Sequence, residues 1–260
     1  MSTILLDKVK QLNYTDVVIL WRLGFSLYPI TYIISIPLTY FLQRYSGKIS
    51  EIWSVKFLEN YIVRNYIILW FTILYFGNLL NFQNSQVSIS FHDPKTVKSI
   101  KIYFLNIIWL TILLEWFFGS PIFERVSIAL GAYCTKSEFN KEYKCEQNGG
   151  KWINLFDSSS HYTMLISNSL LIWYLVIPYI SRHMFKNIKL DLEQAGLQQE
   201  PTIEEQPEKL KTILVYLSLL FIVLWYISFC ITSLFFHTIT EKLVGLFCGL
   251  FVPIMIQFIN

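Results

Sequence analysis

Long stretches without a charged residue constrain the fold of this chain more than any other feature. Three of them, 23–42, 162–181 and 212–236, each contain at least 20 residues. A helix needs about 20 consecutive apolar residues to cross the hydrocarbon core of a bilayer. The chain is also 54% apolar and only 15% charged over 260 residues, which is too little polar surface for a soluble domain of this length. We therefore expect an all-α integral membrane protein.

Six transmembrane helices in a single polytopic domain over 1–260 account for the whole pattern. The predicted spans are 23–42, 62–80, 102–118, 162–181, 212–236 and 243–260. Two connections are longer than the others, 119–161 and the polar stretch 182–211, which we expect to be an exposed loop with some helix. Glu115 lies inside the third span, where a carboxylate is either functional or close enough to the interface to reach water.

Two cysteines give the orientation, because the basic residues do not. With six spans both termini share one side, and Lys and Arg divide 11 to 10 between the two faces. Cys134 and Cys145 both lie in the loop 119–161 and are either a disulfide or two free thiols. We favour the disulfide, which persists in oxidising compartments, so this loop is expected to be lumenal. The termini and the loop 182–211 are then cytosolic.

The charge pattern gives no reason to expect a nucleic-acid partner. Net charge is only +3, and the sequence has no Lys/Arg-rich run of the kind that nucleic-acid-binding proteins carry. We expect the protein to act within or at the membrane.

Two histidines are the candidates for chemistry. His161 begins the fourth predicted span and His237 follows the fifth, so both lie on the same membrane face at the depth of the lipid headgroups. Paired histidines can act as nucleophile and general acid. The alternative is that both are ordinary amphipathic residues at a membrane interface, because the imidazole tip can remain in water.

The neighbours of both histidines fit phosphate chemistry. If the segment is helical, Glu241 shares a face with His237 and could fix the tautomer of its ring, while Lys242 adds a cation suited to a phosphate oxygen. The stretch 157–160, Asp-Ser-Ser-Ser, supplies hydroxyl and N–H groups at a helix start just before His161. The alternatives are an N-cap for the fourth span and a solvated helix start at Glu241.

These residues resemble the fat storage-inducing transmembrane (FIT) family. The resemblance rests on the order of the cysteines, the Gly-Gly-Lys-Trp stretch 149–152, the stretch 156–161, and His237-Thr238 followed by Glu241-Lys242. The six-span layout is also similar, and we identify the chain as similar to a fungal member. The family is related to the wider lipid phosphate phosphatase superfamily.

The resemblance implies an enzyme of the endoplasmic reticulum membrane with both termini cytosolic. It implies fatty acyl-CoA diphosphatase activity, which cleaves the CoA pyrophosphate to acyl 4′-phosphopantetheine and adenosine 3′,5′-bisphosphate, in support of lipid droplet formation and phospholipid homeostasis. By motif, His237 is the nucleophile, Glu241 orients it, His161 is the general acid and Ser160 contacts phosphate. Neither a metal nor a cofactor is expected, and the expected partners are fatty acyl-CoA and membrane lipids.

The chain departs from the pattern in two respects. Ser159 occupies a position where the family motif has glycine, and the arginine-bearing parts of the wider group's motifs are absent. We therefore expect Lys242 and Lys151 to stabilise the phosphate charge. A second hypothesis is a non-enzymatic membrane protein that binds diacylglycerol or triacylglycerol and partitions it into droplets.

Overall fold

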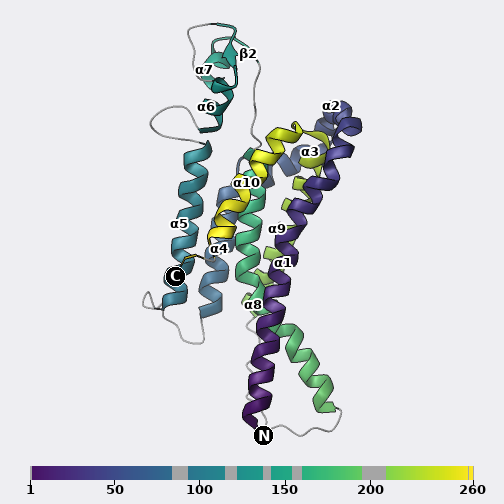
Figure 1. The fold of residues 1–260 in the computed structure, drawn as a ribbon, viewed down its shortest axis with the longest axis vertical. Coiled ribbons are helices and arrows are strands. Elements are labelled where there is room, and N and C mark those ends of the chain that lie inside the picture. Colours follow the sequence, from purple (N-terminus) through teal and green to yellow (C-terminus); the bar gives the residue numbers. More distant parts are fainter. Residues whose placement is uncertain are drawn as a thin grey trace.

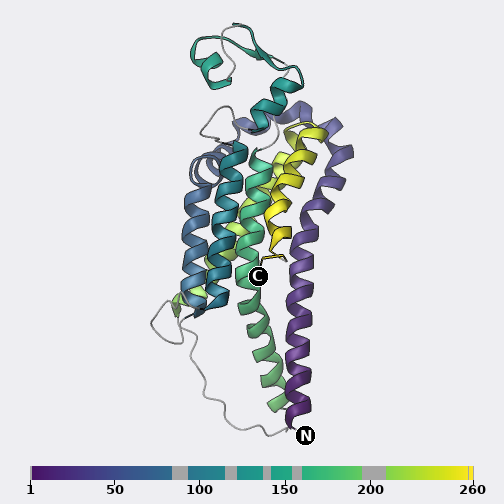
Figure 2. The same ribbon diagram turned by 60° about the vertical axis from the view of Figure 1, so that its left-hand side comes forward.

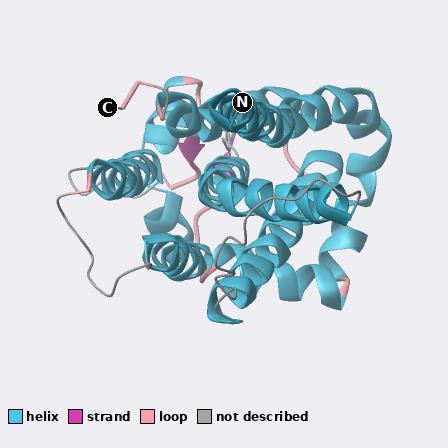
Figure 3. Ribbon diagram, turned by 90° about the horizontal axis from the view of Figure 1, so that it is seen from below, coloured by secondary structure: helices cyan, strands magenta, loops and turns pink. Residues whose placement is uncertain are grey.

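The protein is a bundle of long helices with a small helix–strand unit beyond one end (Figures 1 and 2). The computed structural model describes residues 2–83, 93–114, 122–136, 142–153, 160–194, 209–256 and 258–259. Figure 3 shows that nearly all of the regular structure is helical, with two short strands. The prediction of a helical membrane protein is confirmed.

The described elements, in chain order, are helices except for two short strands. They are α1 (Ser2–Leu42), the 3₁₀-helix η1 (Gln43–Tyr45), α2 (Ser46–Glu51), α3 (Trp53–Phe57), the π-helix η2 (Leu58–Arg64), α4 (Ile67–Gln83), α5 (Pro94–Leu114), α6 (Ile122–Ala129), β1 (Tyr133–Cys134), α7 (Glu142–Gln147), β2 (Trp152–Ile153), α8 (Ser160–Gln194), α9 (Lys209–Phe235) and α10 (Ile239–Met255).

The helix lengths support four membrane spans, or five if a bent pair is counted as one. The four are Val17–Glu51, Pro94–Leu114, Ser160–Ser181 and Lys211–Phe235, and the bent pair is Trp53–Arg64 with Ile67–Leu80. The predicted sixth span corresponds to α10, whose 17 residues are at the short end of the range for a crossing helix. Six spans therefore remain a prediction for the described part of the chain.

Two predicted segments can be compared with the helix ends. The stretch 182–211, expected to be a loop with some helix, begins with helix, because α8 continues to Gln194. The third predicted span corresponds to α5, which ends at Leu114, and Glu115 lies outside the described residues.

Helix α8 is the centre of the bundle and packs against α1, α4, α9 and α10. Its contact with α10 is close because two small residues, Gly245 and Gly249, are buried four positions apart on α10. A Cβ atom on Gly249 would lie only 2.9 Å from the Cβ of Ile166 and 3.1 Å from the carbonyl oxygen of Thr163. Small residues at this spacing bring together the two helices that flank the predicted histidines.

The small unit beyond the bundle is held by a disulfide and a two-stranded sheet. Cys134 is bonded to Cys145, and β1 pairs antiparallel with β2. Gly149 has a φ of 69°, which glycine adopts without strain. A Cβ on Gly150 would lie 2.7 Å from the Sγ of Cys145, so a side chain does not fit there. The backbone conformation at Gly149 and the lack of space at Gly150 thus explain why both positions of the Gly-Gly-Lys-Trp stretch are glycine.

Candidate functional site

A cavity of about 490 Å³ lies at the end of the bundle where α8 and α10 begin and α9 ends. Its walls come from α3, η2, α8, α9 and the turn before α10. The lining residues are Val55, Leu58, Glu59, Val63, Arg64, Ser160, His161, Met164, Leu165, Ser228, Ile231, Thr232, Phe236 and His237. The structure therefore brings both predicted histidines to one cavity, together with Ser160. A volume of this size suits a small-molecule site.

His161 reaches the cavity from the first turn of α8. Because the helix begins at Ser160, the backbone N–H groups of that turn have no partner within the helix and favour an anion nearby. The ring is partly buried and lines the same cavity as His237 and Arg64. Asp157, Ser158 and Ser159, which precede this turn, lie outside the described residues.

His237 has an unusual backbone conformation. Its φ is 61°, the left-handed region that residues other than glycine rarely adopt. The residue lies between the end of α9 and Thr238, the N-cap of α10, so the condition that it shares a helix with Glu241 is not met. Such strained residues persist where the surrounding structure holds them, and they are concentrated at functional sites.

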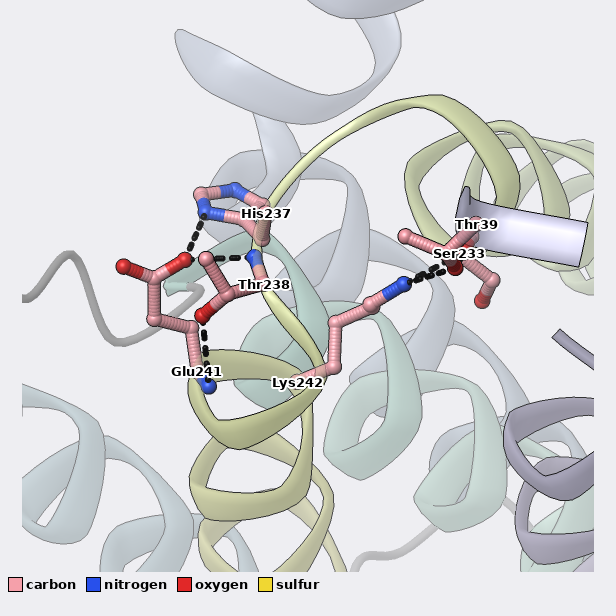
Figure 4. A network of polar contacts seen from close by, with 6 residues as sticks. All are labelled: Thr39, Ser233, His237, Thr238, Glu241 and Lys242. Carbon is pink, nitrogen blue, oxygen red and sulfur yellow. Dashed lines mark hydrogen bonds and ion pairs between the residues drawn. The ribbon is translucent and has the colours of Figure 1, made fainter. Parts of the chain in front are cut away.

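Glu241 holds this turn and also faces the imidazole (Figure 4). The backbone N–H of Thr238 donates to Oε2 of Glu241 at 2.6 Å, and the backbone N–H of Glu241 donates to the Thr238 hydroxyl at 3.4 Å. These two bonds form a capping box. The same Oε2 lies 3.8 Å from Nδ1 of His237, which is an ion-pair distance and too long for a hydrogen bond. The carboxylate therefore faces the Nδ1 side of the ring.

Lys242 does not reach the cavity, which differs from the prediction that it binds phosphate. Its ammonium is fully buried and donates to the Thr39 hydroxyl at 2.6 Å and to the Ser233 carbonyl at 2.8 Å. Figure 4 shows its side chain leading away from His237. Successive residues of a helix point about 100° apart, so Glu241 and Lys242 face different sides of α10. Lys242 instead ties α10 to α1 and α9.

Lys151 is also outside the cavity. It precedes β2 in the disulfide-bonded unit, where its side chain is exposed and its backbone N–H donates to the Thr135 hydroxyl at 2.8 Å. It is not among the described residues that line the cavity. The structure therefore brings neither predicted lysine to the histidines.

Arg64 is the cation that the structure supplies and the sequence reasoning missed. It ends η2 and lines the cavity, and its Nη1 lies 3.9 Å from Oε1 of Glu59, with both side chains substantially exposed. A guanidinium suits phosphate because its donors match two oxygens at once. The signal was available, because the six-span layout places Arg64 on the same membrane face as both histidines.

Among the described residues, no group of three or more His, Cys, Asp or Glu side chains is placed to hold a metal ion. The chemistry that this arrangement can perform is nucleophilic attack by one imidazole and proton transfer by the other, beside a guanidinium.

Comparisons with known proteins agree with the resemblance. Residues 57–257 match the sequence model of a family described as Fat storage-inducing transmembrane protein. A curated relative from Saccharomyces cerevisiae, named Acyl-coenzyme A diphosphatase YFT2, is 26% identical over 144 residues. That alignment covers 55% of this chain and 47% of the yeast protein, about half of its length. No solved structure matches.

Proposed function

Because the chain belongs to the fat storage-inducing transmembrane family, we propose that it is a membrane-bound fatty acyl-CoA diphosphatase. The observation that carries the proposal is that His161, His237 and Arg64 line one cavity, with Glu241 beside the second imidazole. The name of the yeast relative supports the same reaction class. The proposed products are acyl 4′-phosphopantetheine and adenosine 3′,5′-bisphosphate.

The proposed reaction has two steps that use both histidines. In the first, Nε2 of His237 attacks one phosphorus of the pyrophosphate, the bond to the bridging oxygen breaks, and His161 protonates the departing phosphate. In the second, water attacks the phosphorus of the phosphohistidine, the bond from phosphorus to Nε2 of His237 breaks, and His161 accepts the proton of that water. One water is consumed in each cycle. Glu241 stabilises the positive charge that the ring of His237 gains on attack.

Arg64 takes the charge-stabilising role that the sequence assigned to lysines. Phosphoryl transfer depends on positioning and on neutralising charge on the phosphate oxygens. The ion pair of Arg64 with Glu59 is exposed and 3.9 Å long, so a substrate phosphate can displace the carboxylate with little loss. Ser160, one residue before His161, remains our proposed hydroxyl donor to the phosphate.

An acyl-CoA hydrolysis assay tests the proposal. Protein purified in detergent is given a long-chain acyl-CoA, and release of adenosine 3′,5′-bisphosphate is measured for wild type, His161→Ala and His237→Ala. We expect each alanine variant to lose at least about 10²-fold in rate. His183→Ala is the matched control, because His183 lies on α8 22 residues beyond His161. Wild-type rates of hydrolysis in both His161→Ala and His237→Ala would refute the proposed enzymatic activity.

We also propose that the histidine end of the bundle faces the lumen of the endoplasmic reticulum, with both termini cytosolic. The disulfide between Cys134 and Cys145 supports this side, because such bonds persist in oxidising compartments. In sealed microsomes, a membrane-impermeant thiol reagent should label these cysteines only after the membrane is opened and the bond is reduced. Labelling in sealed microsomes treated with an impermeant reductant would show that these cysteines face the cytosol, which is the opposite of the proposed orientation.

A further inference from the structure

The segment that forms one wall of the cavity carries exposed aromatic rings on its other side. Trp53, Phe57 and Tyr61 follow one another at four-residue spacing, which places them along one helix face. With Tyr66 they form a series of ring contacts, which we call the aromatic ladder: the ring centroids of successive members are 5.7, 5.2 and 6.3 Å apart. Trp53 is 77% exposed, Phe57 43% and Tyr61 54%.

The opposite face of the same segment belongs to the cavity. Val55, Leu58, Glu59, Val63 and Arg64 all line it. The helical segment 53–64 thus has the proposed reaction site on one face and the exposed rings of the aromatic ladder on the other. In a membrane protein, tryptophan and tyrosine gather where the hydrocarbon meets the headgroups, because their rings are apolar and their N–H or O–H groups need polar partners.

The direction of the segment also differs from that of a membrane span. Trp53–Arg64 and Ile67–Leu80 are inclined to each other by 61°, with the bend in the two residues between them. If α4 crosses the membrane along its normal, the segment 53–64 lies closer to the membrane plane than to that normal. Figures 1 and 2 show α2 and α3 at the end of the bundle where α10 begins.

Two tryptophans fix this bend by satisfying backbone groups at it. The indole N–H of Trp70 donates to the carbonyl of Tyr61 at 3.0 Å, and that of Trp225 donates to the carbonyl of Ile62 at 3.2 Å. Near hydrocarbon, a carbonyl without a partner is costly, so these bonds stabilise an otherwise unfavourable break. The indoles come from α4 and α9, which means that the bundle itself holds the segment across its end.

We propose that residues 53–64 form an interfacial helix, with the aromatic ladder among the lipid headgroups of the leaflet on the histidine side. The exposed Lys56 and the guanidinium of Arg64 then lie at the level of the lipid phosphates. As a consequence, the cavity opens at headgroup depth, where a lipid-anchored phosphate reaches the histidines while its acyl chain stays in the bilayer. This placement does not depend on the reaction that the site performs.

Depth measurements with spin labels test the placement. Labels are attached after Trp53→Cys, Phe57→Cys and Tyr61→Cys, one at a time, in a background carrying Cys230→Ala and Cys248→Ala. The protein is reconstituted into phosphatidylcholine vesicles, and depth is measured from the collision of each label with oxygen and with a water-soluble nickel complex. Eight residues of helix span about 12 Å, and an inclination of 61° reduces the change in depth to about 6 Å.

We expect all three labels at headgroup depth, differing by about 6 Å or less. The control pair is Tyr216→Cys and Val223→Cys on α9, whose side chains are exposed on a helix long enough to cross, and these should differ by about 10 Å. A change of about 12 Å from position 53 to 61 would make the segment part of a span and overturn the proposal. Labels surrounded by water without lipid contact would overturn it equally. If Trp53→Cys does not fold, positions 57 and 61 still decide between these outcomes.

Discussion

Glu241 offers the sharpest test of the site, because one carboxylate has two separable roles. Its Oε2 accepts a hydrogen bond from the Thr238 backbone at 2.6 Å and lies 3.8 Å from Nδ1 of His237. Glutamine at this position can still complete the capping box but carries no charge. Glu241→Gln therefore removes the electrostatic role and keeps the structural one, whereas Glu241→Ala removes both.

The distance sets the expected size of the effect on rate. Unit charges 3.8 Å apart attract by about 4 kcal/mol at an effective dielectric constant near 20. Both side chains are largely buried, so solvent screens this attraction only weakly. If half of the positive charge on the ring has developed in the transition state, Glu241→Gln loses about 2 kcal/mol, or about 30-fold in kcat, and full development gives about 10³-fold.

The effect on stability should separate the two variants. Loss of a hydrogen bond to a charged group costs about 1.5–3 kcal/mol, so Glu241→Ala should lower the free energy of unfolding by that amount. Glu241→Gln should lower it by only about 0.5 kcal/mol. We would measure kcat by release of adenosine 3′,5′-bisphosphate and stability by thermal unfolding in detergent. Glu51→Gln, which removes an exposed carboxylate at the end of α2, is the control.

One result would refute this reasoning about Glu241. If Glu241→Gln keeps kcat within about threefold of wild type while Glu241→Ala loses it, the carboxylate acts only as a helix cap, and the charge contributes nothing to catalysis.

Three further predictions concern the supports of the cavity. Thr39→Val should lower the free energy of unfolding by about 1.5–3 kcal/mol, because it leaves the buried ammonium of Lys242 with one acceptor fewer. Adding Lys242→Met should recover part of that loss. A double variant less stable than Thr39→Val in thermal unfolding would contradict this. Gly249→Ala should cost about 1–3 kcal/mol in the same assay and lower kcat, since its Cβ would lie 2.9 Å from a side chain of α8. Arg64→Gln should lower kcat/KM by about 10²-fold, because the phosphate loses its guanidinium partner. Glu59→Gln should leave kcat unchanged and lower KM, because the guanidinium loses a competing carboxylate. If Arg64→Gln and Glu59→Gln lower kcat/KM equally, that result would argue against phosphate binding by Arg64.

The helical membrane architecture and the meeting of the two histidines followed from local sequence alone. Lengths of charge-free chain determine where a helix can cross, because lipid offers the backbone no other partner. Counting spans then placed His161 and His237 at one end of the bundle, where they line the same cavity. The disulfide was foreseen in the same way, from two cysteines 11 residues apart in one loop.

The directions of individual side chains could not be predicted in this way. The shared face of His237 and Glu241 was expected on condition that the segment is helical, whereas α10 begins at Ile239 and its N-cap is Thr238. Where a helix begins decides which side each of its residues faces, since every position turns the direction by about 100°. Glu241 therefore reaches His237 by folding back over the cap, while Lys242 turns to Thr39 and Ser233.

The sequence by itself thus determined a helical membrane protein with two histidines at one end of its bundle. Only the tertiary structure decided which cation accompanies them. Arg64 enters the cavity because the chain bends by 61° between η2 and α4, and that bend is held by indoles from Trp70 and Trp225, the latter on α9. Hydropathy depends on neighbours along the chain, whereas such a bend depends on hydrogen bonds between residues up to 163 positions apart.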